Sequence, residues 1–574
     1  MEVSMSLVVI VPLLPLVTAV IILVGEPQTL YRRAHLAVLP LVAAFVGALI
    51  TLFVVVSEGA IAVRFYDPSS IANLALPLGF YVDRLSAVMM ALILAVGTIV
   101  YRYSVNYMYE DRFYRRFMAL IGLTTFVLLC MVSSANLIML FIFWQLLSYL
   151  LYLLAHNLTH PATLEGAFKT FTFLRIGDAA FLAGIVLAHS LYGTIEFHEL
   201  FARAAETSLT VSPFPGVEIG GPTAVTLLLF IGVMSKSAQF PLHVWLPSSL
   251  YAPTSVHALL HAGIINAGGF LMNRLAPLYG LSPVTLHVAL VVGTLTAILG
   301  ASMMLTQNDI KKTLGFSTIG QMGYMIMECG LGAFGLGVFH LIAHGIFKAT
   351  VFLNCGNVIH KARQEPAFPP AVQASEEAEI SRLPWSIGFV TTLLMPLMIL
   401  LVAHGVLQIP IRNSQGSVIF LFFIWVTSTQ AILTLTRLRA VASWKVSAAM
   451  LMSLLVIVFT YLFVAERFTA FLYPDRDVVD SYYRAAALPG FLFDGLVVMT
   501  TLLIFLGWVF LNAQTRGHSL RTPLWMERLR IRLYVLFMNR LYLDAAYAKA
   551  GQVVIRIATR VDKGLFERAR WRNP

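Results

Sequence analysis

The sequence predicts an all-α protein that crosses a membrane many times. Its 574 residues are 59% hydrophobic and only 12% charged, whereas about a quarter of the residues are charged in soluble domains. The mean hydropathy is +0.82. Apolar runs of about 20 residues recur through Trp508, and each is long enough to cross a bilayer as a helix. This composition excludes a soluble globular domain.

The apolar runs predict about 15 transmembrane helices. No cleavage motif follows the first run, so we expect it to be retained as a span. In chain order the expected ranges are 6–25, 36–57, 84–101, 117–133, 136–155, 171–192, 223–240, 254–276, 284–305, 313–332, 334–358, 386–408, 417–436, 447–465 and 491–512.

Lysine and arginine predict the orientation, because basic connections stay in the cytoplasm. The alternate connections, such as 58–83, 193–222 and 466–490, are longer and poorer in basic residues. An odd number of spans with this bias places the N-terminus outside and the C-terminus in the cytoplasm. The basic residues of the cytoplasmic connections are Arg32, Arg33, Arg102, Arg112, Arg115, Arg116, Lys311, Lys312, Lys361, Arg363, Arg382, Arg437, Arg439 and Lys445.

The segment 519–574 alternates basic with apolar residues, which predicts an amphipathic helix on the cytoplasmic surface. It has two interpretations: a basic tail on anionic lipid, or a docking surface for a soluble partner, shared with the Pro-, Ala- and Glu-rich loop 359–385. The net charge of +11 follows from the topology, so we do not expect nucleic acid as a partner. The basic residues of the segment are Arg528, Arg530, Arg532, Arg540, Arg556, Arg560, Lys563, Arg568, Arg570 and Arg572.

The stretch 232–274 combines a charge with helix breakers. Lys236 lies inside an apolar span, which Pro241 and Pro247 interrupt. A lysine at helix-centre depth costs about 3 kcal/mol or more in lipid, so we expect it to face the protein interior and to have a function. Broken backbone at that depth is tolerated only where protein or a watery cavity surrounds it. We therefore expect discontinuous helices around a polar interior.

Two further spans carry titratable groups. Arg175 and Asp178 are three residues apart on one helix face. They form either a structural pair or a charge pair that biases a neighbouring lysine. His340, His344 and Lys348 follow at intervals of four residues and share a slowly drifting face, which favours a path for protons or ions.

His257 and His261 repeat the four-residue spacing in another span, and neutral histidine both accepts and donates a proton near neutral pH. The competing interpretation is a metal site, but no carboxylate or cysteine accompanies these histidines at ligand spacing. Cys130, Cys329 and Cys355 are isolated and form no metal or cluster motif. We expect no metal and no cofactor in this chain.

The hexapeptide GLGAFG at 330–335 matches a dinucleotide-binding pattern, but no strand precedes it and no acidic residue follows at the required distance. We expect a turn between two helices. No GxxxxGK motif is present, so ATP is not the expected energy source.

Several long motifs are shared with a known family: KSAQFPLHVWLP, APTSVHALLHA, NDIKKTLGFSTIGQMGYM, HLIAHGIFKATVFLNCG, FKTFTFLRIGD and MNRLYLDAAY. With them the chain resembles the antiporter-like subunits of respiratory complex I and of Mrp-type antiporters. The resemblance implies two inverted repeats of five spans, at 117–276 and 284–436. Around them lie N-terminal helices (1–116), C-terminal helices (445–512) and a basic amphipathic cytoplasmic segment (513–574).

The resemblance also implies ion translocation along a buried polar axis. Lys236 would be its central lysine and Arg175 with Asp178 a charge pair. The relay groups would be His261, His340, His344 and Lys348, and we add His257 as a candidate.

The chain departs from the family pattern at several positions. Gln145 replaces the usual buried glutamate, so we expect Asp178 to be the nearest counter-ion of Lys236, with Glu328 as a weaker candidate. The span after Pro384 offers only His404 where the family has a lysine or glutamate. Serine or histidine replaces residues usual in quinone reductases at Ser248, Ser249, Ser255 and His257.

The stretch HALLHAGIINAGGFLMNRLAPL most resembles the DabB family of membrane subunits of energy-coupled inorganic carbon transporters. This resemblance implies a bacterial inner-membrane subunit that conducts H+ or Na+ and catalyses no covalent reaction. Its partner would be a DabA-like cytoplasmic subunit, whose carbonic-anhydrase-like zinc site hydrates CO2 to bicarbonate. Two alternatives stay open: a proton-pumping subunit of a quinone reductase or hydrogenase, and a subunit of an Mrp-type cation/proton antiporter.

Overall fold

The structure, a computed structural model, describes residues 2–65, 78–155, 161–364, 463–492 and 524–570, with isolated positions at 452, 456, 460 and 495. Several expectations fall outside these residues. They are the spans 386–408 and 417–436, nearly all of 447–465 and 491–512, most of the loop 359–385, and His404.

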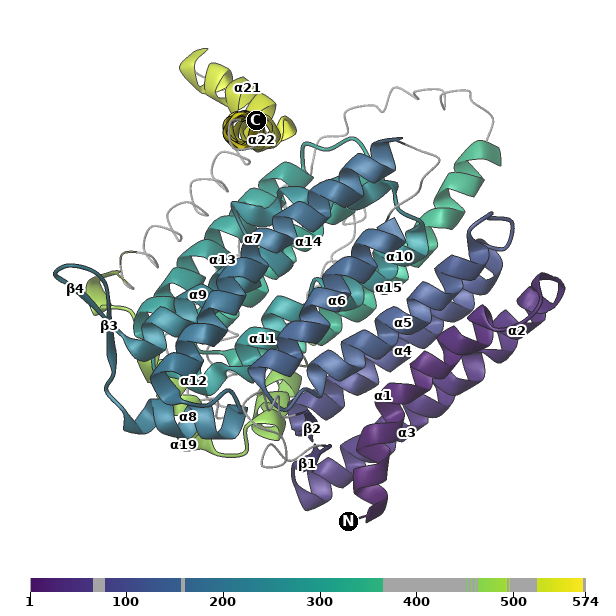
Figure 1. Cartoon of the computed structure of the whole chain (residues 1–574), viewed down its shortest axis with the longest axis horizontal. Helices are drawn as coiled ribbons and strands as arrows, with labels where there is room; N and C mark the ends of the chain where they lie inside the picture. The colour runs from purple at the N-terminus through teal and green to yellow at the C-terminus, as the bar shows by residue number, and fades with distance from the viewer. Residues whose placement is uncertain are drawn as a thin grey trace.

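Long helices that run side by side in alternating directions form the body of the molecule (Figure 1). Within the described residues, nine helical stretches are long and apolar enough to cross a membrane, which confirms a multi-pass helical protein. Eight of these stretches correspond to α1 (Glu2–Leu23), α3 (Val38–Glu58), α4 (Arg84–Tyr107), α5 (Tyr114–Val132), α6 (Leu137–Ala155), α7 (Pro161–Tyr192), α13 (Pro283–Met304) and α15 (Phe334–Gln364). The ninth is Thr254–Arg274, and α14 (Ile310–Gly330) is a further long helix.

Several expected spans differ from the observed helices at one end. Helix α4 ends at Tyr107 rather than near residue 101, and α15 ends at Gln364 rather than near residue 358. Helix α7 begins at Pro161 rather than near residue 171. Glu165 and Lys169 lower the hydropathy of its first turns, and Lys169 pairs there with Asp544. Helix α9 (Gly221–Lys236) ends at Lys236 rather than near residue 240, because the backbone turns away before Pro241, with Ala238 at φ 48°.

Short elements fill the connections between the long helices. Two antiparallel strand pairs, β1 (Ile61–Arg64) with β2 (Gly79–Val82) and β3 (Thr210–Phe214) with β4 (Val217–Gly220), are exceptions to the all-helical expectation. The short helices are α2 (Leu30–Leu36), α8 (Phe197–Glu206), α12 (Ala276–Gly280) and α19 (Arg476–Ala485). The GLGAFG sequence forms the turn between α14 and α15, where Gly332 has φ 78°. A Cβ there would lie 2.5 Å from the Tyr482 carbonyl oxygen.

The helix after Lys236 is discontinuous, as its prolines predict. A 3-10 segment (Leu242–Tyr251) follows α9. The next span consists of α10 (Thr254–Leu259), one π-helical turn (Leu260–Ile264) and α11 (Ala267–Arg274). This broken span is almost wholly covered by other helices, so its polar side chains are screened from lipid.

Helices α13 and α14 lie in closer contact than side chains would allow. A Cβ placed on Gly293, Gly300, Gly323 or Gly330 would lie only 2.4–2.5 Å from a backbone nitrogen of the opposite helix. Glycine permits this approach because it has no side chain, as at many interfaces between membrane helices. The two helices therefore form one tightly packed pair.

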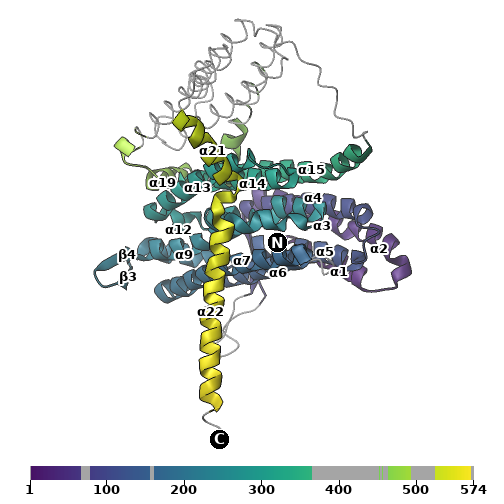
Figure 2. The ribbon, with the colours of Figure 1, turned by 90° about the horizontal axis from the view of Figure 1, so that it is seen from above.

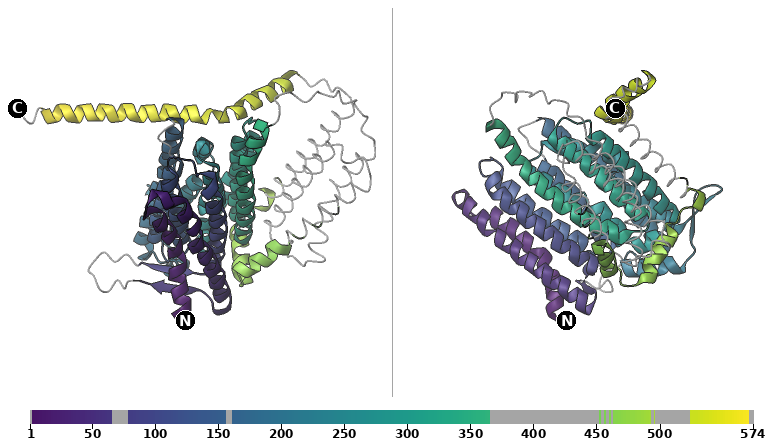
Figure 3. Two further views of the ribbon diagram at one scale, coloured as in Figure 1. Left: turned by 90° about the vertical axis from the view of Figure 1, so that its right-hand side faces the viewer. Right: turned by 180° about the vertical axis from the view of Figure 1, so that it is seen from behind.

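The C-terminal part of the chain lies across one end of the bundle. Helix α21 (Leu524–Met538) is followed by α22 (Leu543–Arg570), which runs roughly perpendicular to the long helices and extends past them (Figure 2 and Figure 3). The start of α1 and helix α22 lie at opposite ends of the bundle (Figure 3).

A buried ion pair joins the start of α4 to the end of α11. The Arg274 guanidinium donates to both carboxylate oxygens of Asp83, at 2.7 and 3.1 Å, and also to the Ser86 hydroxyl. Arg274 is 4% exposed at its side chain and Asp83 28%. Burial alone would raise the pKa of Asp83, but Arg274 and the hydrogen bonds from Ser86 hold it below its ordinary value.

We predict that Arg274→Gln lowers the free energy of unfolding by about 2–4 kcal/mol, because it leaves a partly buried carboxylate without its cation. Denaturant titration in mixed micelles measures this change. The control is Arg64→Gln, which removes an exposed pair with Glu196 and should cost less than about 1 kcal/mol.

The lowered pKa of Asp83 sets the pH dependence of this effect. The stabilisation is present above the ordinary aspartate pKa and is lost only as the pH falls through the lowered value. The cost of Arg274→Gln should therefore stay constant from about pH 5 to about pH 8. An equal cost for Arg64→Gln and Arg274→Gln would contradict the role assigned to this pair.

Candidate functional site

Lys236 lies at the last turn of α9, where the helix breaks, and is 1% exposed. Its Nζ donates to the Trp144 carbonyl oxygen at 3.0 Å and to the Ser148 hydroxyl at 2.5 Å. It also lies 4.8 Å from the centre of the Trp144 ring. Among the described residues no carboxylate lies within 4 Å of this ammonium group. Neutral oxygens and an aromatic face therefore hold the charge directly.

The predicted counter-ion Asp178 reaches Lys236 through Trp144. The Trp144 indole Nε1 donates to Asp178 Oδ1 at 2.7 Å, while the same ring faces Lys236. Asp178 also pairs with Arg175 at 2.8 Å, as their spacing on α7 predicts. Arg175 donates in turn to the side-chain amide oxygen of Gln145. These residues form a continuous polar chain from α9 through α6 to α7.

Gln145 occupies the position where the family pattern has a glutamate, and its contact gives the substitution a physical reason. Its amide oxygen accepts from Arg175 without adding a second negative charge beside Asp178. Arg175 also lies 4.7 Å from the Phe171 ring centre. The guanidinium is thus shared by one carboxylate, one neutral acceptor and one aromatic ring.

The histidines of the broken span stack on an aromatic ring of α15. The rings of His257 and His261 lie 6.0 Å apart, and the Phe352 ring is 5.5 Å from the first and 4.4 Å from the second. His261 is fully buried, and neither of its ring nitrogens has a hydrogen-bond partner among the described residues. It lies within the π-helical turn, an irregularity that is frequent at functional sites.

On α15 the three predicted groups lie along one face but differ in their contacts. His340 Nδ1 is 3.1 Å from Glu328 Oε1, and its Nε2 is 2.9 Å from the Gln321 amide oxygen. His344 is buried, 6.3 Å from His340 between ring centres. Lys348 is 1% exposed and donates to the Leu314 carbonyl oxygen at 3.3 Å.

The predicted site residues therefore gather in two groups. The first contains Lys236, Trp144, Asp178, Arg175 and Gln145. The second contains the histidines of the broken span with His340, His344 and Lys348 of α15, which packs directly against that span. Glu328, which we considered as a weaker counter-ion for Lys236, instead pairs with His340.

Sequence reasoning missed the residues that join the members within each group. Trp144, Ser148 and Phe352 carry no titratable group, although a tryptophan directly before Gln145, the one tryptophan of that span, was a usable signal. Arg274 and Asp83 lie 191 positions apart, and nothing in their local spacing indicates the pair. For the metal alternative, the described residues contain no cluster of three potential ligands among His, Cys, Asp and Glu.

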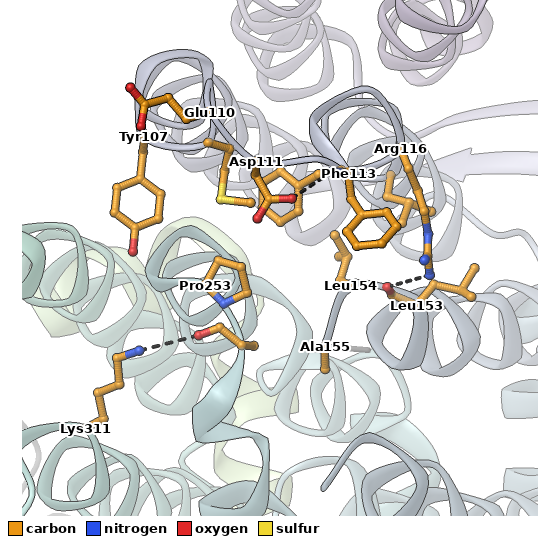
Figure 4. A pocket seen from close by; sticks show the side chains of 14 residues that line it. Tyr107, Glu110, Asp111, Phe113, Arg116, Leu153, Leu154, Ala155, Pro253 and Lys311 are labelled. Carbon is orange, nitrogen blue, oxygen red and sulfur yellow. Dashed lines mark hydrogen bonds between the residues drawn. The ribbon is translucent and has the colours of Figure 1, made fainter. Parts of the chain in front are cut away.

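Cavities lie at both ends of the bundle. One of about 520 Å³ is bordered by the ends of α4 and α6 and the start of α14 (Figure 4). Charged groups line it, among them Asp111, Arg116 and Lys311, and Pro253 in its wall directly precedes the helix that carries His257. The other, of about 580 Å³, lies at the opposite end and is lined by Arg64, Asp83, Glu196 and Arg274, among others.

Two family models match the chain. The NADH:quinone oxidoreductase/Mrp antiporter transmembrane family matches residues 134–427. The N-terminal family of NADH-ubiquinone oxidoreductase (complex I) chain 5 matches residues 69–118. The first model covers both groups of candidate residues.

Among named relatives, the probable inorganic carbon transporter subunit DabB1 of Halothiobacillus neapolitanus is 38% identical over 96% of this chain and 98% of its own length. NAD(P)H-quinone oxidoreductase subunit 5 of the Zygnema circumcarinatum chloroplast is 39% identical, over 63% of this chain and 52% of that protein. NADH-quinone oxidoreductase subunit L of Neisseria meningitidis is 38% identical, over 51% of this chain and 44% of that protein.

Solved structures share the fold at low sequence identity. The Mrp complex from Dietzia sp. superposes with a TM-score of 0.59 at 19% identity, over 96% of this chain and 60% of that chain. The archaeal membrane-bound sulfane sulfur reductase gives 0.57 at 18% identity, over 85% of this chain and 100% of that chain.

The bond from Trp144 to Asp178 can be tested by a double-mutant cycle. We predict that Trp144→Phe and Asp178→Ala are coupled by about 1–3 kcal/mol in the free energy of unfolding, because each removes one side of a buried bond to a charged group. Denaturant titration of the two single variants and the double variant gives the coupling.

Trp245→Phe is the matched control, because Trp245 is equally buried and its Nε1 donates to the Ser235 carbonyl oxygen. It should show no coupling to Asp178→Ala. Similar coupling energies for the two tryptophans would refute the bridging role of Trp144.

Proposed function

The chain belongs to the NADH:quinone oxidoreductase/Mrp antiporter transmembrane family, together with the DabB-type subunits of inorganic carbon transporters, and we propose that it conducts cations for such a transporter. The observation that carries the proposal is the likeness to DabB1, which extends over nearly the full length of both chains. In this function the chain is a transporter subunit and catalyses no covalent reaction itself. It lets H+ or Na+ run inward across a bacterial inner membrane, with the N-terminus outside and the C-terminus in the cytoplasm.

Lys236 is the proposed switched charge. An ammonium in a lipid-screened interior depends on the few groups around it, so its protonation is sensitive to the field of the neighbouring Asp178–Arg175 pair. Trp144 connects these groups physically, because it touches Lys236 with its ring and Asp178 with its Nε1. A shift of Arg175 between Asp178 and Gln145 would change the charge that Lys236 experiences.

The histidine groups are the proposed relay. His257 and His261 face α15, which carries His340, His344 and Lys348, and histidine exchanges protons near neutral pH. The two cavities offer candidate ends for this path. The polar cavity bordered by Lys311 adjoins the start of the broken span, and the cavity at the opposite end adjoins its last residue, Arg274.

In this proposal the cation flow drives a DabA-like cytoplasmic partner with a carbonic-anhydrase-like zinc site. A carbonic anhydrase alone cannot accumulate bicarbonate, because it only speeds an equilibrium. One charge that crosses about 150 mV supplies roughly 3.5 kcal/mol. At about 1.4 kcal/mol per tenfold change, this biases an equilibrium several hundredfold. Coupled hydration of CO2 would therefore trap bicarbonate against a substantial gradient.

A second candidate function rests on the matches to quinone oxidoreductase subunits, which cover half or more of this chain. A proton-pumping subunit of a quinone reductase or hydrogenase would stand beside redox subunits. An Mrp-type antiporter subunit would instead support growth in sodium.

We predict that Lys236→Ala abolishes inorganic carbon uptake by the complex while leaving it assembled, because no other described cation occupies this position beside Trp144. Uptake of labelled bicarbonate in a strain that depends on the transporter measures the effect. Lys312→Ala, in the first turn of α14, is the control and should retain uptake. Full uptake in a well-expressed Lys236→Ala strain would eliminate Lys236 as the switched charge.

We also predict that affinity purification of the chain from its native membrane brings down a zinc-containing cytoplasmic protein, identified by mass spectrometry and metal analysis. Iron–sulfur or flavin proteins in its place would select the quinone reductase function. Further antiporter subunits without a zinc protein would select the Mrp-type function.

A further inference from the structure

Helix α22 carries an apolar stripe along its length, although the exposed Ile555 lies off this stripe. Leu543, Tyr547, Val554, Ile557 and Val561 follow one another at steps of four, seven, three and four residues. Such steps place all five side chains on the same face of a helix. This face has a defined direction in the structure, because its first part contacts the bundle.

The first two residues of the stripe are docked on the end of the transmembrane bundle. The Tyr547 ring packs edge-on against Phe173, with 4.8 Å between ring centres, and its hydroxyl donates to the Pro241 carbonyl oxygen at 3.2 Å. Leu543 packs against the same core. Asp544 pairs with Lys169 of α7 and with Arg540. The stripe therefore faces the bundle end, beside the break that follows Lys236.

The rest of the stripe continues past the bundle without cover from the described chain. Val554 is 64% exposed, Ile557 55% and Val561 56%. A helix of 28 residues is about 42 Å long, and it extends beyond the long helices at the level where they end (Figure 3). The face of α22 that contacts the bundle therefore also contacts the medium that surrounds the bundle at the same depth.

Basic residues occupy the flank of the helix away from the stripe. Lys549, Arg556 and Arg560 are exposed and follow at steps of seven and four residues, so they share a face of their own. A helix with an apolar face toward the bundle and a basic face beside it has the composition of helices that lie in a lipid interface. Anionic lipid of the cytoplasmic leaflet attracts basic groups that lie near its surface.

We propose that α22 is an interfacial helix that binds anionic lipid headgroups and places Val554, Ile557 and Val561 among the adjoining acyl chains. Lipid is the favoured occupant because the stripe continues a face already docked on the membrane-spanning bundle. A soluble partner would approach from the cytoplasm, on the opposite side of the helix. The anchoring of α22 at Lys169 and Pro241 would then connect the lipid surface to the break beside Lys236.

The test measures how deep single positions of α22 lie in the membrane. The native cysteines Cys130, Cys329 and Cys355 are buried, so a cysteine introduced into the full-length chain takes a nitroxide label selectively. Labels at positions 554, 557 and 561 are compared with labels at 549, 556 and 560. The protein is reconstituted in vesicles of phosphatidylcholine, with and without phosphatidylglycerol.

We expect the ratio of oxygen to nickel-complex collision rates to be several-fold higher for the stripe labels than for the flank labels. The contrast should fall when phosphatidylglycerol is left out. The ratio at the stripe labels should also fall when Lys549, Arg556 and Arg560 are all changed to Gln in the stripe-labelled variants. This measurement needs neither a partner nor transport, so it can fail while the proposed carbon-uptake function stands, and the reverse also holds.

Three outcomes would overturn the proposal. Equal, water-like accessibility at all six positions would mean that the helix does not enter the interface. Protection of the stripe with spin–spin broadening that disappears on dilution with unlabelled protein would assign it to a second copy of the chain. Protection that arises only after a cytoplasmic extract is added would assign it to a soluble partner.

Discussion

The structure around α9 depends on how the protein solvates Lys236, a lysine that neither lipid nor water reaches. Transfer of an ammonium group into an apolar interior is costly unless protein groups take over its solvation. Here the Trp144 carbonyl oxygen, the Ser148 hydroxyl and the Trp144 ring provide this solvation. The carboxylate of Asp178 stays one residue away, behind Trp144. A direct salt bridge would hold the charge firmly, whereas this arrangement leaves it responsive to its neighbours.

Most of the fold could be predicted from the sequence because hydropathy and regular spacing are local properties. The apolar runs predict every described span, and the spacings of Arg175 with Asp178 and of His340 with His344 predict their shared faces. The errors occur where local composition misleads. Glu165 and Lys169 hide the first turns of α7, and the short strands lie in connections with no strong pattern.

The candidate site was predictable only in part, because its contacts join residues that are distant in the chain. Spacing identifies Lys236 and the histidines as unusual, but it does not indicate that Trp144 stands between Lys236 and Asp178, or that Phe352 stacks on His261. The Arg274–Asp83 pair connects positions 191 residues apart. Such pairings depend on how the helices pack, which no periodicity within one segment encodes.

The glycine contacts between α13 and α14 have a mechanical consequence. Backbones at this distance interlock, so neither helix can slide or rotate past the other without a clash. Helices α13 and α14 can therefore move only together, as one rigid unit. Any rearrangement that accompanies a moving charge must then fall on the segments whose hydrogen-bonded ladder is already interrupted, from the end of α9 to the π-helical turn before α11. The α13–α14 pair packs against these segments, so it would stay in place while they change conformation.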